Sequence, residues 1–512
     1  MPNEIELKLR IASADVPHLS HHPAILAALS EKPVTRKLTS IYYDTPQLAL
    51  LDAGISLRVR RMSGGWFQAV KAAGHSLSGL HQRMEWEDII AFGHPDFSKI
   101  TAPELTKIFD DPVLRAALAP IFSTVVHRTE WQLAWENGDR IELALDLGNL
   151  VIGDPSSTGK NEPISEIELE LKGGNTGRLF ELARELQQVI PLTLENISKA
   201  QRGYAHYRPQ APVVLKAQRT RLKHNVSARD AFSQIAWECL SQMQGNQDMV
   251  LNGTDPEGVH QMRVALRRLR SVFSVFRALI DQQSCAPLQS DIRWISEVLG
   301  TARDLDVFIT ETLPPLRQHL HAQPGLQQLR ENAESARLQA YAEVRTALAS
   351  QRYQRLQLAL ADGLTSHRWH TADTPEIPAL DIARRMLAKR YQQLRRHGEH
   401  LGEMHPEERH AARIAAKRLR YAAEFFDSLY PDAKTNGFLR ALAALQDILG
   451  ELNDIAVTES LIHTLAGNRP GKALDATLHL VTGWNASNTL HRLASMEKAW
   501  KRFARQKPFW DS

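Results

Sequence analysis

Charged residues near the start of the chain alternate with apolar ones, and this spacing could bring acids and bases onto one surface. In the segment Glu4-Ile5-Glu6-Leu7-Lys8-Leu9-Arg10 every charged residue has an even number. Successive side chains of a β-strand point to opposite faces, so such a strand would carry its charges on one face and its apolar side chains on the other. Carboxylates are ligands for Mg²⁺ or Mn²⁺, and Lys and Arg bind phosphate oxygens. The segment is therefore suited to phosphate chemistry assisted by a metal.

The same alternation recurs in four more segments of the first 200 residues. Their charged positions are Arg58 and Arg60; Arg83, Glu85 and Glu87; Glu142 and Asp146; and Glu166, Glu168, Glu170 and Lys172. A single strand of this kind is ordinarily half-buried, with its polar face in water. Five of them, several mixing acids with bases, favour a closed barrel with an apolar exterior covered by helices and a charged interior. Such an interior requires its charges to be paired or neutralised by ligands.

An interior that combines carboxylates with Lys and Arg suits a polyphosphate bound together with a divalent metal. The carboxylates would hold Mg²⁺ or Mn²⁺, and the cations would hold phosphate oxygens. A metal in this position polarises a phosphoryl oxygen and helps to produce the nucleophilic water. The charged interior is thus suited to metal-assisted chemistry on a bound polyphosphate.

Residues 1–205 resemble the CYTH, or triphosphate tunnel metalloenzyme, family. The resemblance is carried by Glu4-x-Glu6-x-Lys8, Arg58-x-Arg60, Lys71, Arg83-x-Glu85, Arg128, Asp146, the Glu-x-Glu run that ends at Glu170, and Ser198-Lys199, all in order. It implies an eight-stranded antiparallel tunnel that hydrolyses triphosphates with Mg²⁺ or Mn²⁺.

The resemblance also implies roles for individual residues. The metal ligands would be Glu4, Glu6, Glu168 and Glu170, with Asp146 as a further ligand or a water-orienting carboxylate; Glu166 has the same parity and could replace either neighbour. The phosphates would be bound by Lys8, Arg58, Arg60, Lys71, Arg83, Arg128, Lys199 and Arg202. Glu85 would be a supporting carboxylate, which makes Glu4, Glu6, Lys8, Glu85, Asp146 and Lys199 the expected catalytic set.

After about residue 222 the sequence changes to long helical stretches that contain an internal repeat. His260-Gln-Met-Arg263 followed by Arg267-Arg-Leu-Arg270 recurs 150 residues later as His410-Ala-Ala-Arg413 followed by Lys417-Arg-Leu-Arg420. The same offset relates Leu299-Gly300 to Leu449-Gly450. Two matches at one spacing predict two similar helical bundles within one domain.

Each copy of the repeat predicts a helix with a basic stripe. At 3.6 residues per turn, His260, Arg263, Arg267 and Arg270 share one side, as do His410, Arg413, Lys417 and Arg420. A solvated helix face is the simpler interpretation of one stripe. We expect these stripes to lack the Glu at i+4 that would neutralise them, so two facing stripes would bind a long polyanion. The histidines would either donate a hydrogen bond to phosphate or cap the stripe.

This half of the chain resembles the CHAD family, the conserved-histidine α-helical domain. The resemblance extends from about residue 223 to 505. It implies two four-helix bundles related by pseudo-twofold symmetry and inorganic polyphosphate as the ligand. The eight stripe residues named above would be the polyphosphate-binding residues.

The whole chain is thus expected to be a multidomain α+β protein. It would contain a tunnel domain at 1–208, a linker at 209–222 and a helical domain at 223–508, with repeat copies at about 223–370 and 375–508. Residues 1–210 hold about 22 Lys plus Arg against 26 Asp plus Glu, so the net charge of +4 averages an acidic part and a basic part. With two cysteines and no targeting signal or apolar span, we expect a cytoplasmic protein, with polyphosphate granules as a place of association.

The resulting functional hypothesis is metal-dependent hydrolysis of inorganic triphosphate to pyrophosphate and phosphate, with long-chain polyphosphate bound by the helical half. One alternative is a polyphosphate-binding or targeting protein with a slow or vestigial tunnel. A weaker alternative is an adenylate cyclase, for which no adenine pocket is evident. Neither nucleic acid nor a membrane is an expected partner, since the stripes lack interleaved aromatics. The sequence leaves open the oligomeric state, the choice of metal and the preferred phosphate substrate.

Overall fold

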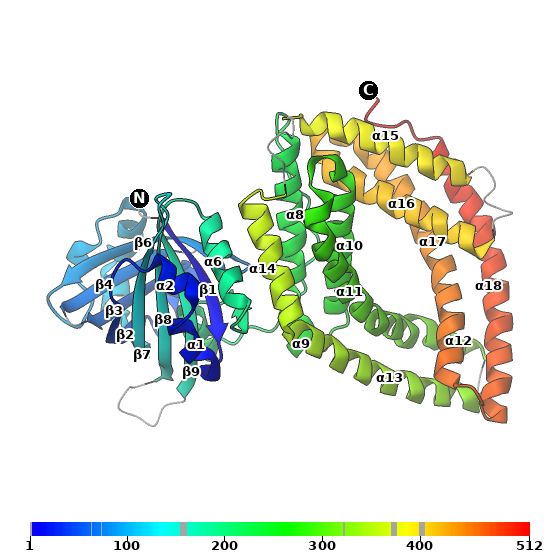
Figure 1. Ribbon diagram of the computed structural model, residues 1–512. Coiled ribbons are helices and arrows are strands. Elements are labelled where there is room, and N and C mark those ends of the chain that lie inside the picture. Colours follow the sequence, from blue (N-terminus) through cyan, green and yellow to red (C-terminus); the bar gives the residue numbers. More distant parts are fainter. Residues whose placement is uncertain are drawn as a thin grey trace. The chain divides into compact units, whose positions relative to one another are not determined.

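The computed structural model describes residues 3–62, 64–72, 74–153, 161–320, 323–369, 376–398 and 405–511. The chain forms two compact units (Figure 1). One unit comprises Met1–Ala211 together with Gln351–His367, and the other comprises Pro212–Ser350 and Arg368–Ser512.

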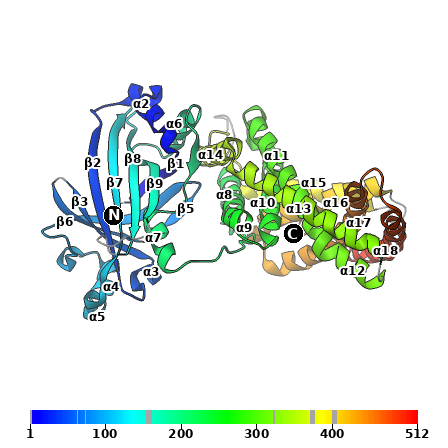
Figure 2. The ribbon, with the colours of Figure 1, turned by 90° about the horizontal axis from the view of Figure 1, so that it is seen from below.

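The first unit is built on a closed antiparallel barrel. Eight strands form its wall in the order β1-β9-β8-β7-β2-β3-β4-β6, and β6 pairs back with β1. These strands are β1 (Asn3–Ile11), β2 (Val34–Asp44), β3 (Ile55–Met62), β4 (Gly65–Ala72), β6 (Leu80–Ile90), β7 (Ala119–Ala134), β8 (Arg140–Ile152) and β9 (Asn161–Gly173). Short strands β5 (His75–Leu77) and β10 (Leu192–Leu194) pair with β6 and β1. Figure 2 shows β2, β7, β8 and β9 side by side in the wall.

The alternation in the sequence gives this barrel its apolar exterior. Leu7 and Leu9 of β1 and Ile167 and Leu169 of β9 are fully buried on the outer face, where α6 packs against both strands. The helices of this unit are α1 (Val16–Ser20), α2 (Pro23–Ala28), α3 (Ala49–Asp52), α4 (Pro103–Phe109), α5 (Pro112–Ala117), α6 (Gly177–Gln187), α7 (Lys199–Tyr207) and α14 (Gln351–Thr365). The charged residues of the same strands are therefore left to face inward.

Helix α14 belongs to this unit although it is distant in sequence from the barrel. It contacts α6 and β10, and Asp362 on α14 accepts a hydrogen bond from Arg184 Nη1 at 2.6 Å. The bounds expected from the sequence assign this segment to the helical half. Those bounds remain a prediction, but the tunnel unit as folded includes Gln351–His367.

The second unit is helical, and its elements repeat in order. Its helices are α8 (Ala228–Gly245), α9 (Gln247–Asn252), α10 (Glu257–Val275), α11 (Gln282–Val307), α12 (Leu313–His319), α13 (Pro324–Ala349), α15 (Ala379–Gly398), α16 (Pro406–Phe426), α17 (Asp432–Ala466) and α18 (Lys472–Ala504). A short 3₁₀ turn follows both α10 and α16, at Arg277–Leu279 and Asp427–Leu429, 150 residues apart.

The two copies of the repeat meet at the starts of α8 and α15. The Ala228 N–H donates to the Ile377 carbonyl at 2.7 Å, and the Ala379 N–H donates to the Val226 carbonyl at 3.0 Å. This reciprocal exchange joins corresponding points of the two copies. It is the pattern that a pseudo-twofold axis produces, whereas the division into two four-helix bundles stays a prediction.

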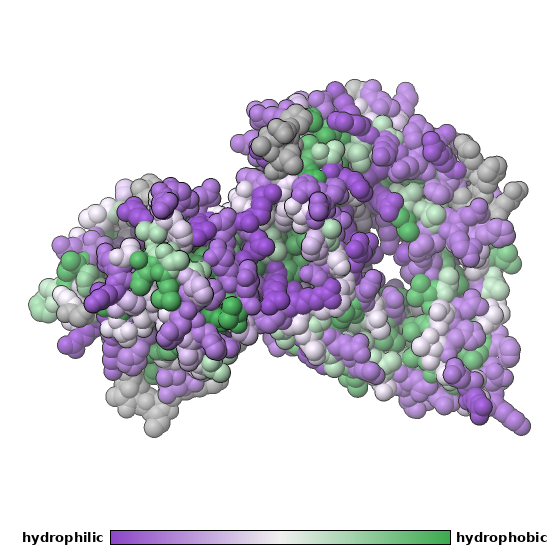
Figure 3. Space-filling model, viewed as in Figure 1, coloured by the Kyte–Doolittle hydropathy of each residue, from purple (hydrophilic) through white to green (hydrophobic). Residues whose placement is uncertain are grey.

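Hydrophilic side chains predominate on the face seen in Figure 3. None of the helices in the described ranges combines the length and apolarity needed to cross a membrane.

Candidate functional site

The barrel encloses a cavity of about 590 Å³. Eight carboxylate side chains and nine Lys or Arg side chains line it, so opposite charges are nearly balanced. The lining includes the sequence-predicted residues Glu4, Glu6, Lys8, Arg58, Arg60, Lys71, Arg83, Glu85, Arg128, Glu168, Glu170 and Lys199. The strand alternation therefore brings together most of the predicted site residues.

Strand pairing sets the rows of charge across the tunnel wall. Glu6 lies opposite Glu170, Lys8 opposite Glu168, and Arg10 opposite Glu166 along β1 and β9. Lys8 contacts both Glu6, at 2.9 Å, and Glu168. Each strand thus supplies the neutralising partner for a side chain of the next strand.

The register of β9, which the sequence leaves open, separates its three glutamates. Glu168 and Glu170 line the cavity. Glu166 is fully buried, outside the cavity lining, and forms an ion pair with Lys199. Arg202 also lies outside the lining and pairs with Glu162 at 2.6 Å.

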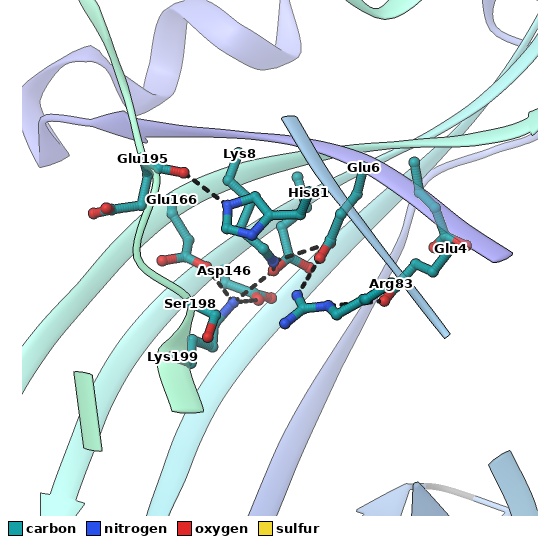
Figure 4. A network of polar contacts seen from close by, with 12 residues as sticks. Glu4, Glu6, Lys8, His81, Arg83, Asp146, Glu166, Glu195, Ser198 and Lys199 are labelled. Atoms are coloured by element: carbon teal, nitrogen blue, oxygen red, sulfur yellow. Dashed lines mark hydrogen bonds and ion pairs between the residues drawn. The ribbon is translucent and has the colours of Figure 1, made fainter. Parts of the chain in front are cut away.

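A dense ion-pair cluster forms around Lys199 and Asp146 (Figure 4). The Lys199 ammonium is 2.6 Å from Asp146 Oδ2 and 3.0 Å from Glu168 Oε1. Arg128 donates two hydrogen bonds to Asp146, from Nε to Oδ1 at 2.7 Å and from Nη2 to Oδ2 at 2.6 Å. Arg128 also forms an ion pair with Glu168. Burial by itself would raise the pKa of Asp146, but Arg128 and Lys199 outweigh it and hold that pKa well below its usual range.

Asp146, Glu166 and Glu168 offer oxygens that lie within 4.8 Å of one another, which is close enough to hold a metal ion. The Lys199 ammonium already contacts all three carboxylates. An ammonium and a metal ion would compete for the same oxygens. This cluster is therefore less suited to hold a metal than the second acidic region of the cavity, around Glu4 and Glu170.

The other acidic region centres on Glu4 and Glu170. Lys71 contacts Glu4 at 2.7 Å and Glu85 at 3.0 Å. Burial, and then repulsion by Glu6, raises the pKa of Glu4. Burial also raises the pKa of Glu170, and Glu4 adds to this shift. These carboxylates repel one another even with their cations in place, and a hard divalent cation would relieve that repulsion.

Arg60 is the cation of the tunnel that most clearly lacks a counter-charge. Its Nε donates to Ser40 Oγ at 3.0 Å, and within the described ranges it forms no ion pair. Burial, followed by repulsion from Arg58 and Arg128, lowers the pKa of Arg60 to about 10. An anion in the cavity would stabilise this guanidinium.

Several lining residues fall outside the set predicted from the sequence: Arg36, Tyr42, Ser56, Met62, Glu87, Glu130, Glu142, Lys172, Ser198 and Ala200. Three of them, Glu87, Glu142 and Lys172, lie an even number of positions from a predicted residue of the same strand. The alternation therefore places them on the inner face, and it could have identified them. Tyr42 lies on β2, which has no alternating charge, and its ring stacks on Phe122 with centroids 4.5 Å apart. Only the barrel closure brings that strand to the site.

The basic stripes of the helical unit lie on α10 and α16, which contact each other. Burial is the largest cause that lowers the pKa of Lys417, to about 7, and repulsion from Arg267 and Arg413 adds to it. Arg267 on one stripe is therefore near Arg413 and Lys417 on the other. Asp304 lies 4.0 Å from Arg263 and Asp454 lies 3.5 Å from Arg413, so the positive charge is only partly offset.

The stripes differ in detail from the sequence expectation. Arg420 Nε donates to Glu424 at 2.7 Å, so the expectation that the stripes lack a neutralising Glu at i+4 is wrong at this position. Arg270 is exposed and lies near Arg293 and Arg418. His410 Nδ1 lies 2.8 Å from Asn453 Oδ1, whereas burial and Arg303 lower the pKa of His260.

The fold and the charged cavity define a triphosphate-tunnel type of domain joined to a helical domain with paired basic stripes. Residues 2–204 match the CYTH domain family and residues 234–463 match the CHAD domain family, which confirms both resemblances seen in the sequence. The chain is therefore a two-domain CYTH and CHAD protein.

Similar proteins support both assignments. An inorganic triphosphatase of Haemophilus influenzae is 32% identical over 206 residues, which are 40% of this chain and 55% of that protein. The chain thus spans about half the length of this relative. An uncharacterised protein of Mycobacterium tuberculosis is 26% identical over 502 residues, covering 92% of this chain and 90% of that protein. The crystal structure of the CHAD domain from the plant Ricinus communis is 32% identical, with a TM-score of 0.51, over 57% of this chain and 97% of that one.

Proposed function

We propose that the tunnel hydrolyses inorganic triphosphate to pyrophosphate and phosphate with the help of Mg²⁺ or Mn²⁺. The observation that carries this proposal is the cavity wall, which combines carboxylates with cations and in which Arg60 forms no ion pair with any described residue. A purely anion-binding tunnel would gain nothing from eight carboxylates beside its ligand. Their presence is explained if a cation bridges them to phosphate.

The residues present fit such a metal. Glu4, Glu6, Glu168 and Glu170 line the cavity and offer hard oxygen ligands. Burial raises the pKa of Glu4 and of Glu170, and repulsion from neighbouring carboxylates adds to it, so a divalent cation would stabilise their charged forms. A divalent ion bound there would polarise a phosphoryl oxygen and lower the pKa of a bound water. Asp146, fully buried behind Arg128 and Lys199, would act by positioning those two cations.

The cations of the tunnel would bind and orient the substrate. Arg58, Arg60 and Arg128 would hold phosphate oxygens and stabilise the charge that develops in the transition state. The oxygen of one water would bond to the terminal phosphorus, and the bond from that phosphorus to the bridging oxygen would break, leaving its electron pair on the departing pyrophosphate. The proton that the water loses would pass to solvent. Although burial opposes it, Lys71 and Arg58 lower the pKa of Glu85 to about 2, so this carboxylate is ionised and would orient the water.

The experiment for the tunnel compares phosphate release from tripolyphosphate, ATP and long-chain polyphosphate in Mg²⁺, Mn²⁺ and chelator. We expect metal-dependent release with tripolyphosphate as the best substrate. Arg60→Gln should lower kcat/KM by roughly 10²- to 10³-fold, since it removes a preorganised donor. Lys107→Gln, at an exposed position of helix α4 in the same unit, is the matched control. Absence of metal-dependent release by the unmodified chain would reject the hydrolase and favour a binding protein.

We further propose that the stripes of α10 and α16 bind long-chain polyphosphate. The support is the contact between α10 and α16, which brings Arg267 near Arg413 and Lys417. Burial is the largest cause that lowers the pKa of Lys417, and repulsion from these two arginines adds to it. Calorimetric titration of the full chain with polyphosphate, in chelator, tests this. Arg267→Gln combined with Arg413→Gln should weaken binding at least 10-fold, whereas Arg330→Gln, an exposed residue paired with Glu334, should not. Equal affinity for all three proteins would reject the stripe as the binding surface.

A further inference from the structure

The loop Glu195–Ser198 determines where Lys199 enters the tunnel. It joins β10 to α7, and Lys199 is the first residue of α7. Ser198 caps this helix: its hydroxyl accepts from the Gln201 N–H at 3.2 Å, and its own N–H donates to Gln201 Oε1 at 2.8 Å. Because the cap fixes the first turn, any displacement of the loop would carry the Lys199 backbone with it.

The hairpin formed by β5 and β6 holds this loop through three hydrogen bonds. Ser76 Oγ donates to the Asn196 carbonyl at 2.7 Å, and the Gly79 N–H donates to Asn196 Oδ1 at 2.6 Å. His81 Nε2 lies 2.9 Å from the Glu195 carbonyl. A carbonyl only accepts hydrogen bonds, so His81 must carry its proton on Nε2.

The turn of this hairpin also ties the loop to β1. Ser78 and Gly79 both have positive φ, 55° and 75°, and a Cβ at Gly79 would lie 2.8 Å from the Lys8 carbonyl oxygen. Glycine allows the close approach in which the Lys8 N–H donates to the Gly79 carbonyl at 2.8 Å. The Glu195 N–H in turn donates to the Lys8 carbonyl at 2.9 Å. Lys8 and Lys199, which share Glu168 as an ion-pair partner, are thus both tied to this backbone network.

We propose that Asn196 and His81 are positioning residues that hold the Lys199 ammonium among Asp146, Glu166 and Glu168. Neither residue lines the tunnel cavity, so neither would touch a phosphate bound there. Their effect on turnover rests on the proposed function, in which Lys199 binds phosphate. Their effect on the position of Lys199 does not depend on any substrate.

The first test measures the position of Lys199 without a ligand. Acetic anhydride is added to the full chain, and the modification of each lysine is followed by mass spectrometry. We expect Lys199 to be protected relative to exposed Lys107, and Asn196→Ala to increase its reactivity at least fivefold. Asn175→Ala is the matched control, because Asn175 Oδ1 accepts from the Gly177 N–H at 2.8 Å at the start of α6. Unchanged protection of Lys199 in Asn196→Ala would overturn the proposal.

The second test is a double-mutant cycle on tripolyphosphate hydrolysis. Asn196→Ala should lower kcat/KM by roughly 10- to 100-fold through displacement of Lys199. In a Lys199→Ala background the same change should cost less than about twofold, because the residue it positions is gone. His81→Gln keeps a donor near Nε2 and should retain most activity, whereas His81→Leu should resemble Asn196→Ala. Equal losses of Asn196→Ala in both backgrounds would mean a general structural role and overturn the proposal.

The two tests separate the two proposals. If the unmodified chain hydrolyses nothing, the proposed function fails, and the protection of Lys199 still decides the positioning role. If the chain hydrolyses tripolyphosphate but Lys199 is equally protected in every variant, the positioning role alone is rejected.

Discussion

The tunnel and the helical stripes are both rich in Lys and Arg. They differ in how far neighbouring carboxylates compensate the positive charge. In the tunnel, carboxylates outweigh the effect of burial and raise the pKa of Lys8, Arg58, Arg83 and Lys199. In the stripes, burial dominates and lowers the pKa of Arg263, Arg413 and Lys417. A tunnel ligand must therefore replace existing partners or bring a cation with it, whereas the stripes gain from any polyanion.

This contrast predicts different selectivity. If the proposed functions hold, a phosphate that enters the tunnel would have to fit a wall whose ion pairs are already arranged, and shape and metal would set the choice of substrate. The stripes present partly uncompensated charge along α10 and α16, so the charge density of a ligand would set its affinity for them. Arg60 is the position where the tunnel resembles the stripes, because repulsion from Arg58 and Arg128 adds to the lowering of its pKa by burial.

The largest effect should come from Glu168→Gln, which removes the carboxylate shared by Lys8, Arg128 and Lys199. Three buried cations would lose a common partner, at a cost of about 3–5 kcal/mol in the free energy of unfolding. We expect activity to fall by more than roughly 10³-fold, in line with loss of a transition-state interaction. Thermal unfolding and phosphate release measure the two effects.

Glu181→Gln is the control for this variant, since Glu181 pairs with Arg178 at 2.8 Å within helix α6 and its side chain keeps contact with solvent. A pair that water can reach contributes about 0–1 kcal/mol, so this change should have a much smaller effect than Glu168→Gln. Equal destabilisation by Glu168→Gln and Glu181→Gln would contradict the view that the tunnel depends on matched charges.

The next largest effect concerns the boundary between the two regions. Residues 1–211 alone lack α14, which contacts α6 and β10 and carries the buried Asp362. Each apolar side chain re-exposed by its loss costs about 1.5–3 kcal/mol. We expect the fragment to unfold at a lower temperature than the tunnel unit in the full chain.

Fusion of residues 350–367 to that fragment through a flexible linker should restore its stability. Scanning calorimetry of the full chain, the fragment and the fusion makes the comparison. A fragment as stable without α14 as with it would show that the tunnel unit is complete by residue 211.

The sequence predicts the tunnel well because alternation in a strand leaves little freedom. Once Glu4 and Glu6 face inward, the pairing of Glu6 with Glu170 and of Lys8 with Glu168 follows from one register. The alternation shows which face a side chain occupies, but it does not show how far along the barrel that side chain lies. Glu166 has the same parity as Glu168, but it lies outside the cavity lining, fully buried in an ion pair with Lys199.

The arrangement of the helical half is harder to predict from the sequence, because helices assemble through side-chain packing that a single sequence does not specify. The repeat predicts corresponding helices, and α10 and α16 carry the stripes as expected. Glu424 stands four residues after Arg420 in the sequence, so the spacing alone allows the ion pair that these two residues form. The membership of α14 in the tunnel unit has no local signal, since it depends on contacts with α6, about 170 residues away.

Lys417 provides a pH test of the stripes. Its pKa is about 7 in the folded chain, against 10.5 for an ordinary lysine, and phosphate oxygens favour its charged form. Polyphosphate affinity should therefore fall roughly 10-fold as the pH rises from 6.5 to 8.5. In the unliganded protein the unfolded state holds this proton up to about pH 10.5, so the contribution of Lys417 to stability increases from pH 7 upward.

Lys417→Met should bind polyphosphate more weakly below pH 7 and should lose most of this pH dependence. Lys472→Met, at the exposed start of α18, should keep the dependence of the unmodified chain. Calorimetric titrations at several pH values provide the affinities and the number of protons taken up. A pH profile unaffected by Lys417→Met would assign the titration to another group.

The smallest effect separates two arginines of the same stripe. Arg413 lies 3.5 Å from Asp454, and its Nε has no hydrogen-bond partner within the described part of the chain, whereas Arg420 is neutralised by Glu424 at 2.7 Å. Arg413→Gln should weaken polyphosphate binding roughly 5- to 10-fold and reduce its salt dependence by about one ion, as for other linear polyanions. Arg420→Gln should lower the affinity for polyphosphate only about twofold. Glu424→Gln should raise that affinity by a similar factor, because it frees the Arg420 guanidinium. If Arg420→Gln weakened binding as much as Arg413→Gln, local pairing would not set the contribution of each cation, and the distinction between compensated and uncompensated charge would fail within the stripe.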